Sequence, residues 1–211
     1  PYRRQRQMCI RDRFVQRLKK LLSYNLGKEG RQTTLRMELE IVKEYIALQQ
    51  MRYDFIIEMN IEDGSYLDQP TVRMLFQPLV ENAIRYGLGD DEKISIQVFE
   101  DVARHLAVVT ISDSGKGLNQ EEIDEINQPF DYDWGYWKNE NRGIGLRYVK
   151  AMLESFYDGQ TSLFVNSKKG FGTRITILLP VRKPEEKKEK DKEVTLEENK
   201  VGQTDESIDC R

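Results

Sequence analysis

The sequence has few of the residues around which many catalytic and structural centres are built: its 211 residues include one histidine and two cysteines. Cys9 and Cys210 lie near opposite ends of the chain, so they predict neither a disulfide framework nor a zinc site. A reducing, cytosolic setting is therefore expected. Every apolar run falls well short of the roughly 20 residues of a membrane span. The formal net charge of -3 gives no basic excess of the kind that nucleic-acid binding needs, so no nucleic-acid partner is expected.

The single histidine lies in an unpromising place for catalysis. Histidine can act as a nucleophile or a base. His105, however, sits where a predicted hairpin turn meets a strand, far in sequence from any helix that could present it to a substrate. We interpret it as a surface residue of the hairpin.

The N-terminal quarter of the chain predicts two helices. Residues 8–13 (MCIRDR) resemble the translation of a transposase adapter, so we interpret residues 1–13 as a sequencing or cloning scar; the alternative is a native basic helix start. Residues 14–26 form a short amphipathic pattern, which Gly27 and Gly30 interrupt. A second amphipathic helix is predicted over residues 34–53, with Thr34 as its N-cap.

Residues 54–181 alternate between strand and helix patterns, which predicts an α+β fold with helices on one face of a mixed, mostly antiparallel sheet. A helix is expected to end at Gly87, with a kink or a broken start at Pro78. Strands are predicted at 55–62, 94–100, 105–112, 162–167 and 173–181, and further helices at 120–126 and 144–157. Residues 182–211 are dense in lysine and glutamate, which predicts a disordered, charged tail.

Three glycine-bearing segments fall at the ends of predicted elements. Residues 113–117 (DSGKG) directly follow a strand, where the Asp113 carboxylate could accept a hydrogen bond from an adenine amino group and the glycines allow close backbone approach. Residues 142–146 (RGIGL) open a helix, whose free N–H groups attract phosphate. Residues 170–173 (GFGT) lead into the last strand, where Thr173 offers a hydroxyl. Each segment alone is more often an ordinary turn, but their order and contexts agree.

A fourth segment lies on the helix that ends at Gly87. Asn82 occupies its polar side, where it is either a solvent-facing amide or an oxygen ligand for Mg²⁺, a metal that takes few protein ligands. Arg85 lies about one turn further on and could reach a phosphate. Asn82, its neighbour Glu81 and Arg85 are the candidate catalytic residues.

Together these segments resemble the GHKL superfamily of ATP-binding domains over about residues 34–181. The wording of residues 75–87 (LFQPLVENAIRYG) and of the preceding helix resembles the LytS/YesM type of sensor histidine kinase. The resemblance implies a two-layer sandwich that binds ATP beneath a mobile lid at 128–142, with Mg²⁺ on Asn82 and adenine at Asp113. The implied ATP-site residues are Asn82, Arg85, Tyr86, Asp113, Gly115, Gly117, Phe130, Lys138, Arg142, Gly143, Ile144, Gly145, Leu146 and Thr173.

The chain departs from this family pattern in three places. Tyr86 stands where histidine is usual, the lid carries Trp134, Tyr136 and Trp137, and the upstream phosphoacceptor histidine motif is absent. We therefore interpret residues 14–53 as the end of the dimerisation and phosphoacceptor helices with a connecting helix, and residues 54–181 as the ATP-binding domain. The resemblance also implies a homodimer through upstream helices, a response regulator as partner, and membrane attachment through an absent N-terminal part.

The expected reaction is transfer of the ATP γ-phosphate to a histidine. ATPase members of the superfamily have a glutamate four residues before the Mg²⁺-binding asparagine, and this chain has Pro78 there. Glu81 is one residue from Asn82 on a helix and so points in another direction. Efficient hydrolysis of ATP is thus not expected. The alternatives are a non-catalytic nucleotide-binding module and, less favoured because of the helices before residue 54, a free-standing serine kinase of the anti-sigma type.

Overall fold

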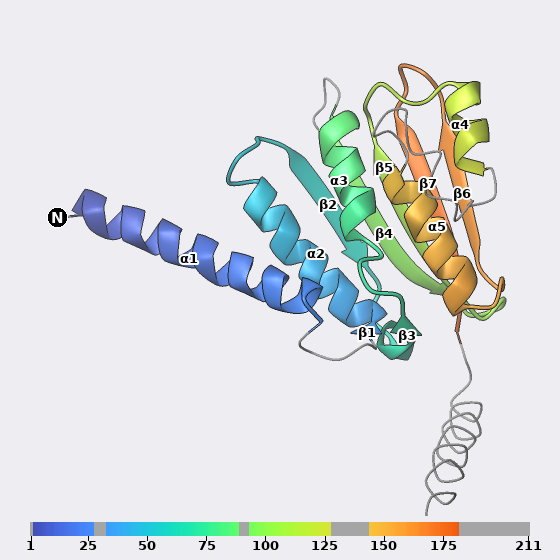
Figure 1. The fold of residues 1–211 in the computed structure, drawn as a ribbon, viewed down its shortest axis with the longest axis horizontal. Coiled ribbons are helices and arrows are strands. Elements are labelled where there is room, and N and C mark those ends of the chain that lie inside the picture. Colours follow the sequence, from blue (N-terminus) through green and yellow to red (C-terminus); the bar gives the residue numbers. More distant parts are fainter. Residues whose placement is uncertain (1, 28–32, 89–92, 128–143, 182–211) are drawn as a thin grey trace, which may run out of the picture. The chain divides into compact units, whose positions relative to one another are not determined.

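The computed structural model describes residues 2–27, 33–88, 93–127 and 144–181. Two helices come first: α1 (Tyr2–Asn25) and α2 (Leu35–Gln49), which pack against each other through Leu21, Tyr24 and Ile41 (Figure 1). The helix predicted to start at residue 14 starts at Tyr2 instead. The residues from Tyr2 to Asn25 contain no glycine or proline, so no backbone signal stops the helix before Gly27, which adopts a φ of 70°. The origin of residues 1–13 stays a prediction.

The start of α2 is the predicted one and its end is not. The Thr34 hydroxyl accepts a hydrogen bond from the Met37 amide at 3.2 Å, which confirms the N-cap. The helix ends at Gln49 rather than at residue 53. Beyond it the chain tightens, because the Met51 and Arg52 amides bond to carbonyls only three residues back.

A five-stranded sheet forms the second layer, in the order β2-β4-β5-β7-β6. β2 pairs with β4 in parallel and the other neighbours are antiparallel, which confirms the mixed, mostly antiparallel prediction. The strands are β2 (Ile56–Ile61), β4 (Lys93–Asp101), β5 (Leu106–Asp113), β6 (Ser162–Ser167) and β7 (Thr173–Pro180). His105 lies exposed in the turn between β4 and β5 with a φ of 55°, as the surface interpretation predicted.

One face of the sheet carries the core. Alternate residues of β4, β5 and β7 are buried there: Ile94, Ile96, Val98, Ala107, Val109, Ile111, Ile175, Ile177 and Leu179. The helices α2, α3 (Gln77–Tyr86) and α5 (Ile144–Phe156) lie across this face (Figure 1). Apolar side chains of α3 and α5 fill the space between the layers: Leu79, Val80, Ala83, Leu146, Val149 and Leu153. The arrangement is the predicted two-layer α+β sandwich.

The broken start predicted at Pro78 is confirmed. α3 begins at Gln77, so the proline occupies the first helical turn, where its missing N–H costs nothing. The preceding Leu75 and Phe76 are fully buried without being helical. The apolar pattern thus begins before the helix itself, and α3 starts next to residues that are buried inside the domain.

Smaller elements complete the described fold. The helix predicted at 120–126 is α4 (Gln120–Asn127), and Asn119 and Glu122 close a capping box with two bonds of 2.9 Å. Two elements were not predicted: the sheet of β1 (Thr33–Thr34) with β3 (Pro70–Thr71), and the 3-10 helix η1 (Ser65–Asp68). A strand of two residues is too short to show the alternation of apolar and polar residues by which strands are predicted from sequence. None of the helices in the described ranges is long and apolar enough to cross a membrane.

Candidate functional site

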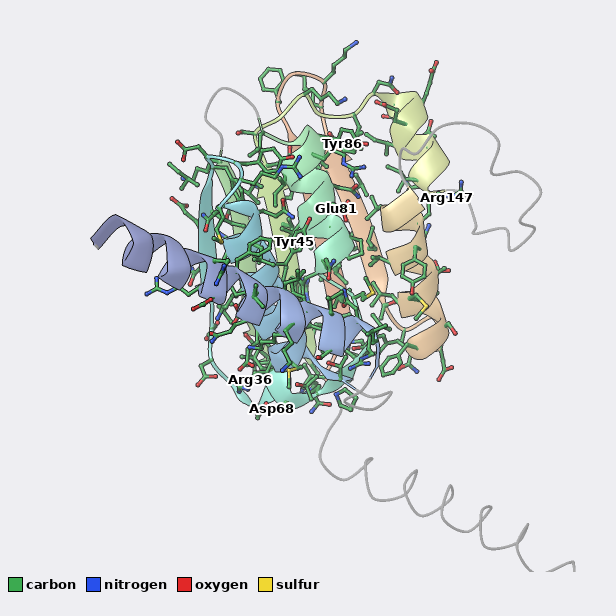
Figure 2. All side chains as sticks on the ribbon, turned by 60° about the vertical axis from the view of Figure 1, so that its left-hand side comes forward. Arg36, Tyr45, Asp68, Glu81, Tyr86 and Arg147 are labelled. Carbon is green, nitrogen blue, oxygen red and sulfur yellow. The ribbon has the colours of Figure 1, made fainter. Side chains whose placement is uncertain are left out.

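A pocket opens between α3 and α5 on one side and the β5–α4 connection, α4 and β7 on the other. Figure 2 shows Tyr86 and Arg147 at this end of the helical layer, with Arg36 and Asp68 at the opposite end. The residues that line the pocket are Leu79, Asn82, Ala83, Tyr86, Gly87, Ile111, Asp113, Lys116, Gly117, Leu118, Glu122, Ile126, Leu146, Arg147, Thr173 and Ile175. They combine an apolar wall with a few polar and charged groups, as small-molecule sites do.

Asp113 is the fixed polar group of this pocket. It ends β5, and its Oδ1 accepts hydrogen bonds from the Gly115 and Thr173 amides, both at 3.1 Å. Burial raises the pKa of the Asp113 carboxyl, while these two amides oppose the rise. The carboxylate is thus held in one orientation by two chain segments 60 residues apart in sequence.

The glycines around Asp113 are explained by close backbone packing. A Cβ on Gly87 would lie 2.4 Å from the Asp113 Cγ, and one on Gly115 would lie 2.4 Å from the Gly87 Cα. A Cβ on Gly117 would meet the Lys168 carbonyl oxygen at 2.2 Å, and one on Gly172 would meet the Asp113 carbonyl oxygen at 2.0 Å. Three segments, at Gly87, 113–117 and 168–172, therefore meet around Asp113 with no room for a side chain at these glycines.

The starts of α3 and α5 approach each other beside Asn82. A Cβ on Gly145 would lie 3.4 Å from the Pro78 Cβ and 3.5 Å from the Asn82 Nδ2, ordinary contact distances. Asn82 and Leu146 line the pocket from these two helices, and their role in binding ATP stays a prediction. Ile144 begins α5. Its side chain lies outside the described part of the chain, as do all of Phe130, Lys138, Arg142 and Gly143.

Two cations of the pocket were not singled out from the sequence. Lys116 lines it and places its Nζ 5.1 Å from the centre of the Tyr86 ring, a cation–π distance. Arg147 lines it with a buried Nε that has no hydrogen-bond partner among the described residues. The only signal in the sequence was their position: Lys116 lies between two glycines, and Arg147 follows Gly145 in the first turn of α5.

Glu81 and Arg85, two of the predicted catalytic residues, do not line the pocket. They form an exposed ion pair with each other at 3.2 Å. Glu81 lies on the side of α3 that faces α2, near Tyr45 (Figure 2). The pKa of Tyr45 is raised to about 12, chiefly by burial and then by the negative charge of Glu81. Besides the ion pair with Glu81, Arg85 lies near one pocket residue, Tyr86, with 5.9 Å from its Cζ to the ring centre. Gly115 and Gly145, also predicted as site residues, are not among the lining residues, but they pack against Gly87 and Asn82, which are.

Two known protein families match this chain. Residues 67–183 match the family described as histidine kinase-, DNA gyrase B- and HSP90-like ATPase. The chain belongs to this ATPase family. Residues 5–56 match a second family, described as histidine kinase. The predicted ATP-binding fold of histidine-kinase type is thereby confirmed, whereas the LytS/YesM subdivision stays a prediction.

The relatives of this chain include sensor protein kinases. The sensor protein kinase HptS of Staphylococcus aureus strain USA300 is 30% identical over 168 residues, which are 79% of this chain and 32% of HptS. The same protein from bovine strain RF122 / ET3-1 matches over the same shares. The chain thus spans about a third of the length of these relatives.

Solved structures support the fold. The catalytic domain of histidine kinase ThkA has a TM-score of 0.53 at 17% identity, over 71% of this chain and 94% of that domain. The histidine kinase AdeS of Acinetobacter baumannii has a TM-score of 0.50 at 18% identity, over 80% and 77%. The two-layer sandwich of the ATPase family is therefore the fold of this chain.

Proposed function

We propose that this chain is the ATP-binding and catalytic part of a two-component sensor histidine kinase. It transfers the γ-phosphate of ATP to a histidine on a helix of the longer protein, for relay to a response regulator. The observation that carries the proposal is the half-buried Asp113 carboxylate, oriented by two backbone amides at one end of a pocket that also contains Asn82, Lys116 and Arg147.

Adenine fits the Asp113 end of the pocket. An oriented carboxylate is an acceptor for an amino group, and Leu79, Ile111 and Ile175 supply the apolar wall against a flat base. A site that is built to bond an N–H rejects analogues without it, because the buried acceptor is then left unpaired. We therefore assign base recognition to Asp113.

The phosphates and Mg²⁺ fit the side of the pocket formed by Asn82 and the first turn of α5. Arg147 in this first turn offers positive charge, and its buried Nε has no hydrogen-bond partner among the described residues. Lys116, beside Tyr86 in the loop after Asp113, adds a second positive charge to the pocket. Asn82 offers an amide oxygen to Mg²⁺, which completes its shell with phosphate oxygens and water. Mg²⁺, when bound, neutralises charge that develops on the transferred phosphoryl group. Glu81 and Arg85 stay predicted catalytic residues. Lys116 and Arg147 are better placed than Arg85 to contact a bound nucleotide, because they line the pocket and Arg85 does not.

Transfer to a protein acceptor is favoured over hydrolysis. A hydrolase needs a base aimed at the attacking water. In the described lining, the carboxylates are those of Asp113 and Glu122, and backbone amides bind both: Gly115 and Thr173 bind Asp113, and Asn119 binds Glu122. Pro78 occupies the position of the hydrolytic glutamate.

The longer protein supplies the rest of the reaction. We propose that it dimerises through its upstream helices, which is consistent with the exposed apolar residues of α1, Phe14, Val15, Leu18 and Leu22. We also propose that it reaches the membrane only through segments outside this chain, so that the ATPase domain faces the cytoplasm. Within the chain, the proposed units are 14–53, 54–181 and a charged tail at 182–211, which lies outside the described residues.

The alternative is a non-catalytic module that binds nucleotide through the same pocket. It is favoured by one observation: the only histidine, His105, lies exposed on a hairpin turn rather than near the pocket. Asn82→Ala separates the two functions. A kinase loses signalling in the longer protein when its metal ligand is removed, whereas a binding module keeps it.

A nucleotide titration tests the proposal directly. Asp113→Asn keeps an Oδ1 for the two amides but presents an NH₂ group to the amino group of adenine, so ATP affinity should fall by about tenfold or more. Asp101→Asn, at the far end of the same β4–β5 pair, is the matched control and should bind ATP as the unmodified chain does. Unchanged affinity in Asp113→Asn would remove the basis of the proposed function.

A further inference from the structure

A buried polar cluster lies where α1, α2 and the start of α3 meet, near β1 and β3 (Figure 1). Its centre is Glu38 of α2, which is 2% exposed, and Tyr24 of α1, also 2% exposed. The Tyr24 hydroxyl donates to the Glu38 carboxylate and shares a 2.8 Å hydrogen bond with the Thr33 hydroxyl. A fully buried carboxylate is costly unless its oxygens are bonded, so this cluster needs an explanation.

The Glu38 carboxylate binds the backbone just before α3. Its two oxygens accept hydrogen bonds from the Met74 amide at 2.9 Å and the Leu75 amide at 2.7 Å. Met74 has a φ of 58°, and this left-handed conformation turns consecutive N–H groups toward one anion. Burial raises the pKa of Glu38, and the hydrogen bonds from Tyr24 and from the backbone amides oppose the rise.

This carboxylate takes the place of a helix cap. Phe76 stands at the N-cap position of α3 and makes no side-chain capping bond, and the first turn of α3 has no acidic residue. A negative charge at a helix start is favoured by the helix dipole. Glu38 supplies that charge from another helix, so the position of α3 depends on α2 and not only on its own sequence.

The last turn of α1 is attached to the same point. The Arg73 guanidinium lies 4.4 Å from the centre of the Tyr24 ring, next to the residues that Glu38 binds. α1 is thus linked to the segment before α3 in two ways: directly, through the Tyr24 ring on Arg73, and indirectly, through the Tyr24 hydroxyl on Glu38 of α2.

α3 leads from this cluster to the pocket. Asn82 lies about 9 Å along the helix axis from Phe76, given 1.5 Å per residue, and Tyr86 lies one turn beyond. Both line the pocket. α3 is a continuous helix of ten residues, so a displacement of its start would reach Asn82.

We propose that Tyr24 and Glu38 are positioning residues of the nucleotide pocket: through the segment at 74–75 they fix α3, so the placement of the end of α1 sets the affinity for Mg-ATP. This inference rests on the proposed function. It also assigns α1 a way to regulate the pocket without touching the nucleotide.

Tyr24→Phe tests the inference, because it removes only the hydroxyl and keeps the ring over Arg73. Tyr66→Phe is the matched control: Tyr66 is 1% exposed, and its hydroxyl donates to backbone carbonyls of Glu62 and Val98, away from α3. In the whole chain, Tyr24→Phe should weaken Mg-ATP binding about fivefold or more, the usual scale of coupling between sites. Tyr66→Phe should leave the affinity unchanged at a similar loss of thermal stability. Equal weakening in both variants, or in neither, overturns the inference.

Hydrogen exchange of backbone amides without nucleotide gives an independent readout. Tyr24→Phe and Glu38→Gln should both speed exchange at Met74, Leu75 and the amides of α3, while β4 and β5 keep their protection. A uniform increase over the whole domain would mean lost stability alone and would overturn the inference. If the unmodified chain fails to bind Mg-ATP, the proposed function fails, whereas this exchange experiment still decides whether Tyr24 acts on α3.

Discussion

The two ends of the helical layer are held by different means. At the pocket end, Gly87, Gly115 and Gly172 pack backbone on backbone around Asp113, with no room for a methyl group. At the opposite end, the contacts are hydrogen bonds between buried side chains and backbone, centred on Glu38 and Tyr157. The backbone contacts fix one geometry, and the side-chain contacts join elements whose relative positions can change.

This difference has a consequence for function. A site that recognises adenine gains from a rigid acceptor, since any loosening of the Asp113 loop costs affinity. At the end that contacts α1, separate hydrogen bonds can be weakened one at a time, so the packing of the helices can change in small steps. We therefore expect substitutions at the pocket end to act by steric clash and those at the other end to act by small, graded losses.

Gly172→Ala should have the largest effect. Gly172 has a φ of 86°, and its new Cβ would lie 2.0 Å from the Asp113 carbonyl oxygen. The cost combines about 1–2 kcal/mol for the left-handed conformation with about 1–3 kcal/mol or more for overpacking. Chemical denaturation should show this loss, and ATP binding should be abolished.

Gly170→Ala is the control for that substitution. Gly170 lies in the same hairpin with a φ of 83°, but its added Cβ would have no atom within 4 Å. It should show only the conformational cost, about 1–2 kcal/mol, and bind ATP normally. Equal losses in the two variants would contradict the view that close packing, rather than backbone conformation, is what the pocket end requires.

Tyr157→Phe should have an intermediate effect. The Tyr157 hydroxyl, just after α5, donates to the Pro70 carbonyl at 3.1 Å and lies 3.1 Å from the Thr71 hydroxyl. Loss of one buried hydrogen-bonding group costs about 1 kcal/mol. Equilibrium unfolding should show this decrease with little change in ATP affinity. A loss as large as that of Gly172→Ala would remove the distinction between the two ends.

The pH dependence of stability should show the smallest effect. The Asp113 pKa is raised in the folded state, so its contribution to stability is fully present below the unfolded pKa and is lost as pH rises through the folded pKa. Asp113→Asn has no such charge, so it should gain stability relative to the unmodified chain as pH rises from the acid range to neutral. The measurement is denaturation of both proteins across that range; a difference that stays constant with pH would contradict the raised pKa.

Much of the fold could be predicted because it depends on local patterns. The period-two alternation located the five strands of the main sheet, and Pro78 indicated where α3 starts. The glycines of residues 113–117 were expected to let the backbone approach a ligand, and the structure shows them packed closely against neighbouring backbone of this chain. Several of the residues predicted to bind ATP line one pocket in the structure: Asn82, Tyr86, Asp113, Gly117, Leu146 and Thr173. Their role in binding ATP stays a prediction.

The parts that could not be predicted depend on contacts between distant residues. The β1–β3 pair and the capping of α3 by Glu38 join segments more than 30 residues apart, and no local period encodes them. One signal was present: Glu38 lies three residues after Leu35 and four before Val42, on the buried stripe of α2. A carboxylate on an apolar stripe indicates a buried partner. Arg147 offered no such signal, because an arginine early in a helix is common on surfaces.

The hydrogen bond from the Thr173 amide to Asp113 also bears on how the domain folds. It joins the end of β5 to the start of β7, so the Asp113 carboxylate, proposed to recognise the base, gains its second orienting amide only after β7 has docked. Contacts of such long sequence separation form late, because loop closure must come first. Mg-ATP should therefore bind the completed fold and not partly folded chains, and by mass action it should stabilise that fold more as its concentration rises. A newly made chain would gain its nucleotide only at the end of folding.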